Sequence, residues 1–132
     1  MTVRDKLQNE DYEIRMEAVQ ETIDQRLLVE VIMMDTNYNV REVAYERLYD
    51  KELIAYVIVE NSNLGYDILD YNAVDKLNDE RCLAYVVRNS SNVHVRSKAV
   101  ERLTDSSTLK EIATNDYDPY IRHLAQQKLL SN

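Results

Sequence analysis

The sequence contains very few of the residues that interrupt regular secondary structure. Among 132 residues there is one glycine and one proline, whereas a β-rich or loop-rich fold needs more of both at its turns. The shortage therefore predicts an all-helical protein. Tryptophan and phenylalanine are absent, and the aromatic side chains are ten tyrosines. A tyrosine can bury part of its ring and keep its hydroxyl in water, which suits thin layers of helix.

Other features that the sequence lacks exclude whole classes of protein. A single cysteine, Cys82, cannot form an internal disulfide or a multi-cysteine metal site. The apolar pattern predicts that it is a buried, inert thiol. No apolar run is long enough to span a membrane, and no signal-peptide pattern opens the chain. We therefore expect a cytoplasmic protein with no membrane partner, folded as one domain over residues 1–132.

The charge is strongly negative and unevenly distributed. The formal net charge is −8, which disfavours direct binding to nucleic acid. Residues 1–60 contain fourteen Asp and Glu against seven Lys and Arg, and residues 61–132 contain ten against nine. The acidic excess therefore lies almost entirely in the N-terminal half.

A pattern of an aliphatic residue, an arginine and an alanine recurs along the chain. Ile14-Arg15 before Ala18 is one copy, and Leu69-Asp70 before Ala73 is a weaker one. The alanines are 26, 29, 26 and 26 residues apart. Such a period identifies a repeat architecture. The five alanines of the pattern are Ala18, Ala44, Ala73, Ala99 and Ala125.

Each repeat is predicted to contain two helices. An aspartate six positions after the alanine is a good N-cap for the first helix of the next repeat, and the pattern itself lies on the second helix. Polar linkers are expected at Asp35-Thr36-Asn37, Asn61-Ser62-Asn63, Asn89–Asn92 and Asn115–Asp118. Short helices of this kind become stable by stacking. The prediction is a right-handed α-solenoid of about five two-helix repeats with a period of about 26 residues. The predicted caps are Asp24, Asp50, Asp79 and Asp105.

Two segments resemble the signature of the HEAT repeat. They are Asp35–Arg41 (DTNYNVR) and Asp116–Arg122 (DYDPYIR), each followed by alanine and then leucine. The short period is also similar to that of the leucine-rich repeat variant. The HEAT resemblance implies a ladder of hydrogen bonds between turn aspartates and helix arginines. The aspartates would be Asp35 and Asp116, and the arginines Arg15, Arg41, Arg96 and Arg122.

The middle of the chain departs from this pattern. Asp70 replaces the arginine, and three extra residues enter around Leu64-Gly65-Tyr66. We expect an irregular junction near residues 61–70 and a break in superhelical curvature there.

Catalysis has little support in the sequence. His94 and His123 are one repeat apart, but no pattern supplies further metal ligands. HEAT-like enzymes include a di-iron hydroxylase that uses His-Glu pairs, and this chain has no such pair. They also include DNA glycosylases with a basic, aromatic groove, whereas this chain is acidic and has no tryptophan. The iron–sulfur cluster associated with the leucine-rich repeat variant needs several cysteines. We predict no catalytic residue, no metal and no cofactor. The remaining enzymatic alternative is a metal-dependent site around the two histidines and neighbouring carboxylates.

The outward face of the second helices is the predicted binding surface. In a HEAT-like stack these helices line the concave side, where tyrosines rimmed by acidic residues are typical of protein interfaces. The alternative is an ordinary solvated polar face. The predicted binding residues are Glu13, Met16, Glu42, Glu46, Tyr71, Asp75, Glu101, Tyr120 and His123. A neighbouring basic row is predicted to form ion pairs between repeats and comprises Arg47, Lys76, Arg102 and Lys128.

The predicted function is a non-enzymatic adaptor that binds a basic segment of another protein on its acidic concave face. The alternative within binding is an inhibitor whose acidic surface imitates nucleic acid and blocks a nucleic-acid-binding protein. A third possibility is self-association through the last repeat, where Leu124 and Leu130 are expected to be exposed. The expected state is therefore a monomer or a weak dimer.

Overall fold

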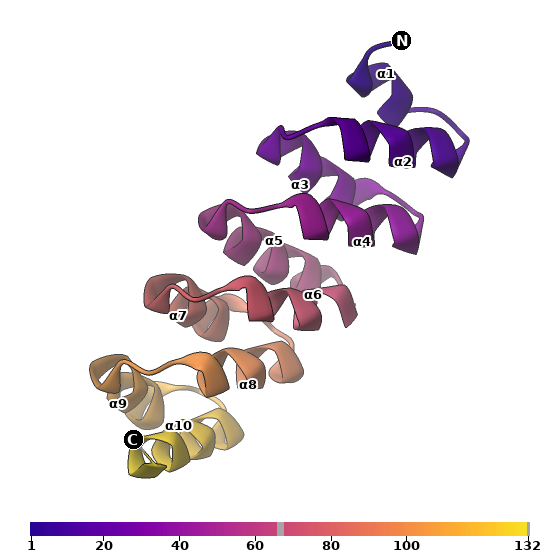
Figure 1. Ribbon diagram of the computed structural model, residues 1–132. Helices are drawn as coiled ribbons and strands as arrows, with labels where there is room; N and C mark the ends of the chain where they lie inside the picture. Colours follow the sequence, from indigo (N-terminus) through magenta and orange to yellow (C-terminus); the bar gives the residue numbers. More distant parts are fainter. Residues whose placement is uncertain (66–67, 132) are drawn as a thin grey trace. The chain divides into compact units, whose positions relative to one another are not determined.

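A computed structural model describes residues 1–65 and 68–131, and every regular element in these ranges is a helix (Figure 1). The prediction of an all-helical fold is confirmed. In chain order the helices are α1 (Val3–Leu7), α2 (Tyr12–Glu21), α3 (Gln25–Met34), α4 (Tyr38–Arg47), α5 (Lys51–Leu64), α6 (Ile68–Ala73), η1 (Val74–Lys76), α7 (Glu80–Asn89), α8 (Val93–Arg102), α9 (Ser106–Asn115) and α10 (Pro119–Ser131).

The chain forms two compact units. Unit 1 comprises Met1–Val57 and unit 2 comprises Ile58–Asn132. The boundary lies within α5, so this helix contributes residues to both. Unit 1 contains thirteen Asp and Glu against seven Lys and Arg, a net charge of −6, whereas unit 2 contains eleven against nine. The acidic excess predicted for the N-terminal half therefore belongs to unit 1.

The predicted aspartate caps are present at the starts of the first helices. Asp24 Oδ1 accepts hydrogen bonds from the backbone N–H groups of Arg26 at 3.0 Å and Leu27 at 3.2 Å. Asp50 caps α5 in the same way. Each cap supplies an acceptor to N–H groups that have no partner inside the helix. The other two caps are Asp79 on α7 and Asp105 on α9.

In unit 1, α1 packs on α2, α3 packs on α4, and α2 packs on α4. The alanines of the repeat are fully buried at Ala18 and Ala44, and their small side chains allow the helices to approach closely. Leu28 and Ile32 of α3 and Leu48 after α4 are also fully buried. These buried alanine, leucine and isoleucine side chains therefore form the core of this unit.

Unit 2 repeats this arrangement. Helix α7 packs on α8 and α9 on α10, while α8 contacts α6 and α10. Ala99 and Ala125 are fully buried, as are Val95, Leu103 and Ile121. The thiol of Cys82 lies within the core, at 7% exposure for the residue. The prediction that this cysteine is buried is confirmed.

The predicted hydrogen bonds between turn aspartates and helix arginines are present in both units. In unit 1 the guanidinium of Arg15 binds the carboxylate of Asp35, at 2.8 Å from Nε and 3.3 Å from Nη2. Arg41 donates to the backbone carbonyl of Asp35 at 3.0 Å. In unit 2 Arg96 pairs with the Asp116 carboxylate, and Arg122 donates to the Asp116 carbonyl at 2.7 Å. The two units thus contain the same polar connection.

The prediction of a linker at Asn61-Ser62-Asn63 is wrong, because α5 continues through these residues to Leu64. The Ser62 hydroxyl donates to the Val59 carbonyl at 3.0 Å and lies 2.8 Å from the Ser90 hydroxyl. Helix α5, with 14 residues, is therefore about one turn longer than α3, with 10. Tyr66, within the irregular segment, lies outside the described residues, and the break in curvature stays a prediction.

Asp70 stands where the pattern has arginine, and in its hydrogen bond with Asn61 the donor and acceptor are exchanged. The Asp70 carboxylate is fully buried. It accepts from Asn61 Nδ2 at 2.9 and 3.2 Å. Asn61 occupies the repeat position of Asp35, 26 residues further along the chain. Here Asn61, within α5, donates and Asp70 of the second helix accepts.

Candidate partner-binding face

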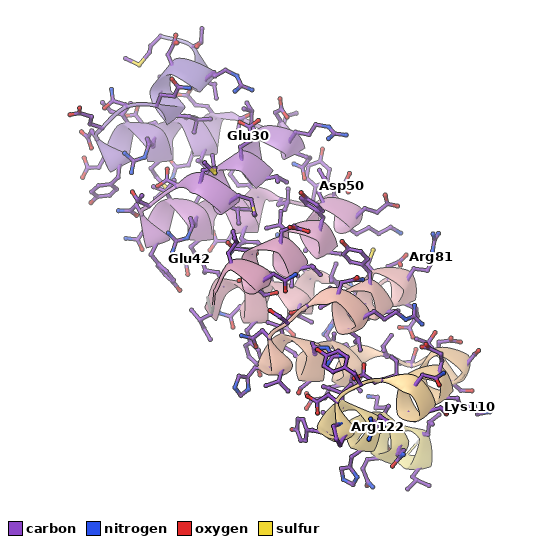
Figure 2. All side chains as sticks on the ribbon, turned by 180° about the vertical axis from the view of Figure 1, so that it is seen from behind. Glu30, Glu42, Asp50, Arg81, Lys110 and Arg122 are labelled. Carbon is purple, nitrogen blue, oxygen red and sulfur yellow. The ribbon has the colours of Figure 1, made fainter. Side chains whose placement is uncertain are left out.

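Four of the predicted binding residues lie on α2 and α4 of unit 1, which pack against each other. Glu13 and Glu46 are exposed, whereas Met16 and Glu42 are half-buried. Figure 2 shows Glu42 on the opposite edge of the unit from Glu30 of α3 and Asp50. Glu42 therefore lies on a side of unit 1 distinct from that of Glu30 and Asp50. We call the four predicted binding residues of this unit the α2/α4 face.

Lys6 adds a cation beside this face that the sequence analysis missed. Its Nζ lies 2.8 Å from Glu21 Oε1 and 4.0 Å from Glu17 Oε2, both on α2. The hydrogen bond to Glu21 raises the pKa of Lys6, and the nearby negative charges act in the same direction. Lys6 therefore balances carboxylates at one border of α2. No periodic feature of the sequence marks this contact, because α1 does not carry the repeat pattern.

The other five predicted residues lie in unit 2, on α6, η1, α8 and α10. Asp75, Glu101, Tyr120 and His123 are exposed, and Tyr71 is half-buried. The Tyr120 side chain keeps 53% of its residue surface exposed. Because α8 packs on both α6 and α10, these residues belong to three neighbouring helices and the short helix after α6.

Tyr71 and Asp75 already have basic partners within unit 2. Lys98 Nζ lies 4.1 Å from the centroid of the Tyr71 ring, in a cation–π contact, and 2.9 Å from Asp75 Oδ2. Arg102 Nη1 lies 3.6 Å from Asp75 Oδ1. The charge of Asp75 is therefore balanced inside the unit. The equivalent of Lys98 is Glu17 in unit 1, so the repeat pattern gave no signal for a lysine here.

The basic row forms the predicted ion pairs only in part. Arg102 contacts Asp75, but its Nε and Nη2 donate to the Leu77 carbonyl at 3.1 and 2.9 Å. Arg47 donates to the Thr22 carbonyl at 3.2 and 2.8 Å, and Lys128 to the Glu101 carbonyl. Carbonyls at helix C-termini lack partners within the helix and carry partial negative charge. They therefore offer acceptors to Arg47, Arg102 and Lys128.

Neither a cluster of metal-binding side chains nor a membrane-spanning helix is found among the described residues. Within residues 1–65 and 68–131, no group of three or more His, Cys, Asp and Glu side chains is placed to hold a metal ion. The imidazoles of His94 and His123 are exposed. In the same part of the chain no helix has the length and apolar character to cross a membrane.

None of the protein families, curated proteins or solved structures compared with this chain matches it. The geometry of the α2/α4 face and its charge are therefore the basis for a functional proposal. Carboxylates on two packed helices can attract and orient a positively charged partner.

Proposed function

We propose that the chain is a HEAT-like α-solenoid that acts as a non-enzymatic adaptor and binds a basic segment of another protein. The observation that carries this proposal is the α2/α4 face: exposed Glu13 and Glu46, with Glu42 and Met16 beside them, on two packed helices of a unit whose net charge is −6. Lysine and arginine side chains of a partner would meet carboxylates there, and Met16 offers an adaptable apolar contact.

The internal organisation of each unit supports the solenoid. Second helices pack on one another, α2 on α4 in unit 1 and α8 on α10 in unit 2, and each also packs on a first helix. The bonds that join Arg15 to Asp35 and Arg96 to Asp116 both connect residues 20 positions apart. Units that repeat the same contacts at the same separation are what a repeat protein requires.

The contacts of Lys98 and Arg102 make unit 1 the main contributor to binding. A partner cation that approaches Asp75 competes with Lys98 at 2.9 Å and Arg102 at 3.6 Å. Tyr120 remains 53% exposed and can supply an aromatic contact in unit 2. We therefore rank Glu13 and Glu42 of the α2/α4 face above Asp75.

The test is affinity capture with two charge-reversal variants, each of which replaces two glutamates by lysine. Glu13→Lys with Glu46→Lys changes the α2/α4 face, and Glu30→Lys with Glu52→Lys changes exposed carboxylates of α3 and α5 in the same unit. Both variants alter the net charge by the same amount. A partner that binds the wild type and the α3/α5 variant, but not the α2/α4 variant, supports the proposal. The partner's binding should also weaken with salt, because exposed charges are screened.

Two outcomes distinguish the alternatives. A partner that both variants retain would move the interface away from the α2/α4 face and overturn the proposal. A partner that both variants lose, and that free DNA or RNA displaces from the wild type, would instead indicate an acidic protein that imitates nucleic acid. Total charge would then matter more than its position.

A further inference from the structure

Two large apolar side chains are presented to solvent from adjacent turns of unit 1. Ile23 lies between α2 and α3 and is 74% exposed, and Tyr49 lies between α4 and α5 and is 71% exposed. They occupy the same repeat position, 26 residues apart. We call Ile23 and Tyr49 the turn pair. Neither residue belongs to the α2/α4 face, although Glu46 of that face lies three positions before Tyr49.

One side chain fixes both turns. Gln25 Nε2 donates to the Ile23 carbonyl at 3.1 Å, and Gln25 Oε1 accepts from the backbone N–H groups of Tyr49 at 2.7 Å and Asp50 at 3.0 Å. The amide of Gln25 thus bridges the two turns directly. Arg47 adds a second connection by donating to the Thr22 carbonyl. The backbone segments that carry Ile23 and Tyr49 are therefore joined before any partner arrives, which lowers the entropic cost of binding.

Unit 2 builds the same pair of turns without the apolar side chains. Glu80 Oε1 accepts from the backbone N–H groups of Thr104 at 2.7 Å and Asp105 at 2.6 Å. Arg102 donates to the Leu77 carbonyl as Arg47 does to that of Thr22. The residues at the positions of Ile23 and Tyr49 are Asn78 and Thr104. The fold of the turn therefore does not require an apolar residue at either position.

The charges around the two pairs of turns are equal in number. Within three positions of Ile23 or Tyr49 there are five carboxylates and three basic side chains, and the same count applies around Asn78 and Thr104. The presence of isoleucine and tyrosine is therefore what distinguishes the pair in unit 1. Exposed apolar groups that gather into one contiguous patch rimmed by polar residues mark interaction sites. An acidic rim selects a partner with basic residues around its own apolar contact.

We propose that the turn pair is a docking site for a protein segment with a large apolar side chain flanked by lysine or arginine. The apolar side chain contacts Ile23 and the Tyr49 ring, and the flanking cations meet the surrounding carboxylates. A second copy of this chain fits less well, because two units with a charge of −6 would repel each other.

The test uses the purified full chain and a library of random short peptides displayed on phage. One variant, Ile23→Asn with Tyr49→Thr, transfers the residues of the unit 2 turns to unit 1, so the backbone has a precedent for them. The matched control, Ile68→Asn with Tyr85→Thr, makes the same chemical changes at two exposed residues of unit 2. Circular dichroism and thermal unfolding verify that both variants fold.

We expect selection to enrich peptides that place an aromatic or long aliphatic residue beside lysine or arginine. Those peptides should bind the Ile23/Tyr49 variant about tenfold or more weakly and the control as tightly as the wild type. Enriched peptides that bind the Ile23/Tyr49 variant as tightly as the wild type would overturn the proposal. A selection that yields no peptide dependent on the turn pair would do the same.

Discussion

Asp35 joins two helices of unit 1 at once. Its carboxylate accepts hydrogen bonds from Arg15 of α2, at 2.8 and 3.3 Å, and its backbone carbonyl accepts one from Arg41 of α4 at 3.0 Å. The side chains of Arg15 and Asp35 are only 14% and 6% exposed. Arg15 also donates to the carbonyls of Asn9 and Glu10, so this one guanidinium organises the turn before α2 and the turn before α4.

Removal of one partner from this pair should be costly. We expect Asp35→Ala to lower the free energy of unfolding by about 3 kcal/mol, because it leaves the Arg15 cation largely buried without its counter-charge. The double variant Arg15→Met with Asp35→Ala should be more stable than Asp35→Ala alone. Urea unfolding of the wild type, both single variants and the double variant measures the coupling. Simple addition of the two single effects would contradict a direct interaction.

A change at Asn61 tests the reversed hydrogen bond of unit 2. Asn61→Asp would bring a second carboxylate against the buried Asp70 in place of the amide that now donates at 2.9 Å. Two carboxylates in contact cannot both ionise cheaply, and the pKa of one must rise. We expect a loss of about 2 kcal/mol or more at neutral pH, and a smaller loss in acid. Urea unfolding measured from neutral to acidic pH checks the prediction. A loss of unfolding free energy that does not change with pH would refute it.

Thr108 controls the acid sensitivity of the cap on α9. Hydrogen bonds from its hydroxyl and its backbone N–H lower the pKa of Asp105 below the ordinary value of 3.8. A lowered pKa in the folded state contributes stability above the unfolded value, and that contribution disappears as the pH falls through the folded value. Thr108→Val should therefore raise the Asp105 pKa and destabilise the protein at neutral pH but not in strong acid.

The Asp105 titration can be followed directly by NMR of the side-chain carboxyl carbon. Thr114→Val is a suitable control, because Thr114 also lies on α9 and its hydroxyl donates to the Lys110 carbonyl rather than to a carboxylate. This control should leave the Asp105 pKa unchanged. If the Asp105 pKa in Thr108→Val equals that of the wild type, the Thr108 hydroxyl is not the cause of the lowered pKa.

The hydrogen bonds that Gln25 and Glu80 accept from the neighbouring turn should differ in strength between the two units. Gln25 accepts two backbone hydrogen bonds as a neutral amide, and Glu80 accepts two as a carboxylate. Hydrogen bonds to a charged acceptor are stronger. We expect Gln25→Ala to cost about 1 kcal/mol and Glu80→Ala about 2 kcal/mol. Amide hydrogen exchange at Tyr49 and Thr104 should accelerate in the respective variants. Unchanged exchange at both would contradict the bridging role.

Much of the local structure could be predicted because the repeat places the same residue type in the same environment several times. An aspartate six positions after a buried alanine caps a helix at Asp24, Asp50, Asp79 and Asp105. The arginine ladder followed from the HEAT-like runs. Of the predicted binding residues, the structure brings Glu13, Met16, Glu42 and Glu46 onto neighbouring helices. Their role in binding remains a prediction.

The features that were missed depend on single residues instead of the period. Asn61-Ser62-Asn63 has the composition of a linker, but the additional residues before α6 allow α5 to continue through it. Lys98 balances Asp75, although other repeats have no lysine at that position. The repeat pattern does not predict the bridging role of Gln25 and Glu80, because the equivalent residues at the starts of α5 and α9 are Lys51 and Ser106.

The connections between neighbouring turns have a consequence for the order in which the protein acquires its structure. Gln25 and its donors are 24 and 25 residues apart, Arg47 and Thr22 are 25 apart, and Ser62 and Ser90 are 28 apart. Contacts with such small sequence separation close short loops and favour rapid folding. On a ribosome each acceptor emerges shortly before its donor. Within each unit, a newly made helix pair can therefore dock on the one that precedes it while the rest of the chain is still being synthesised.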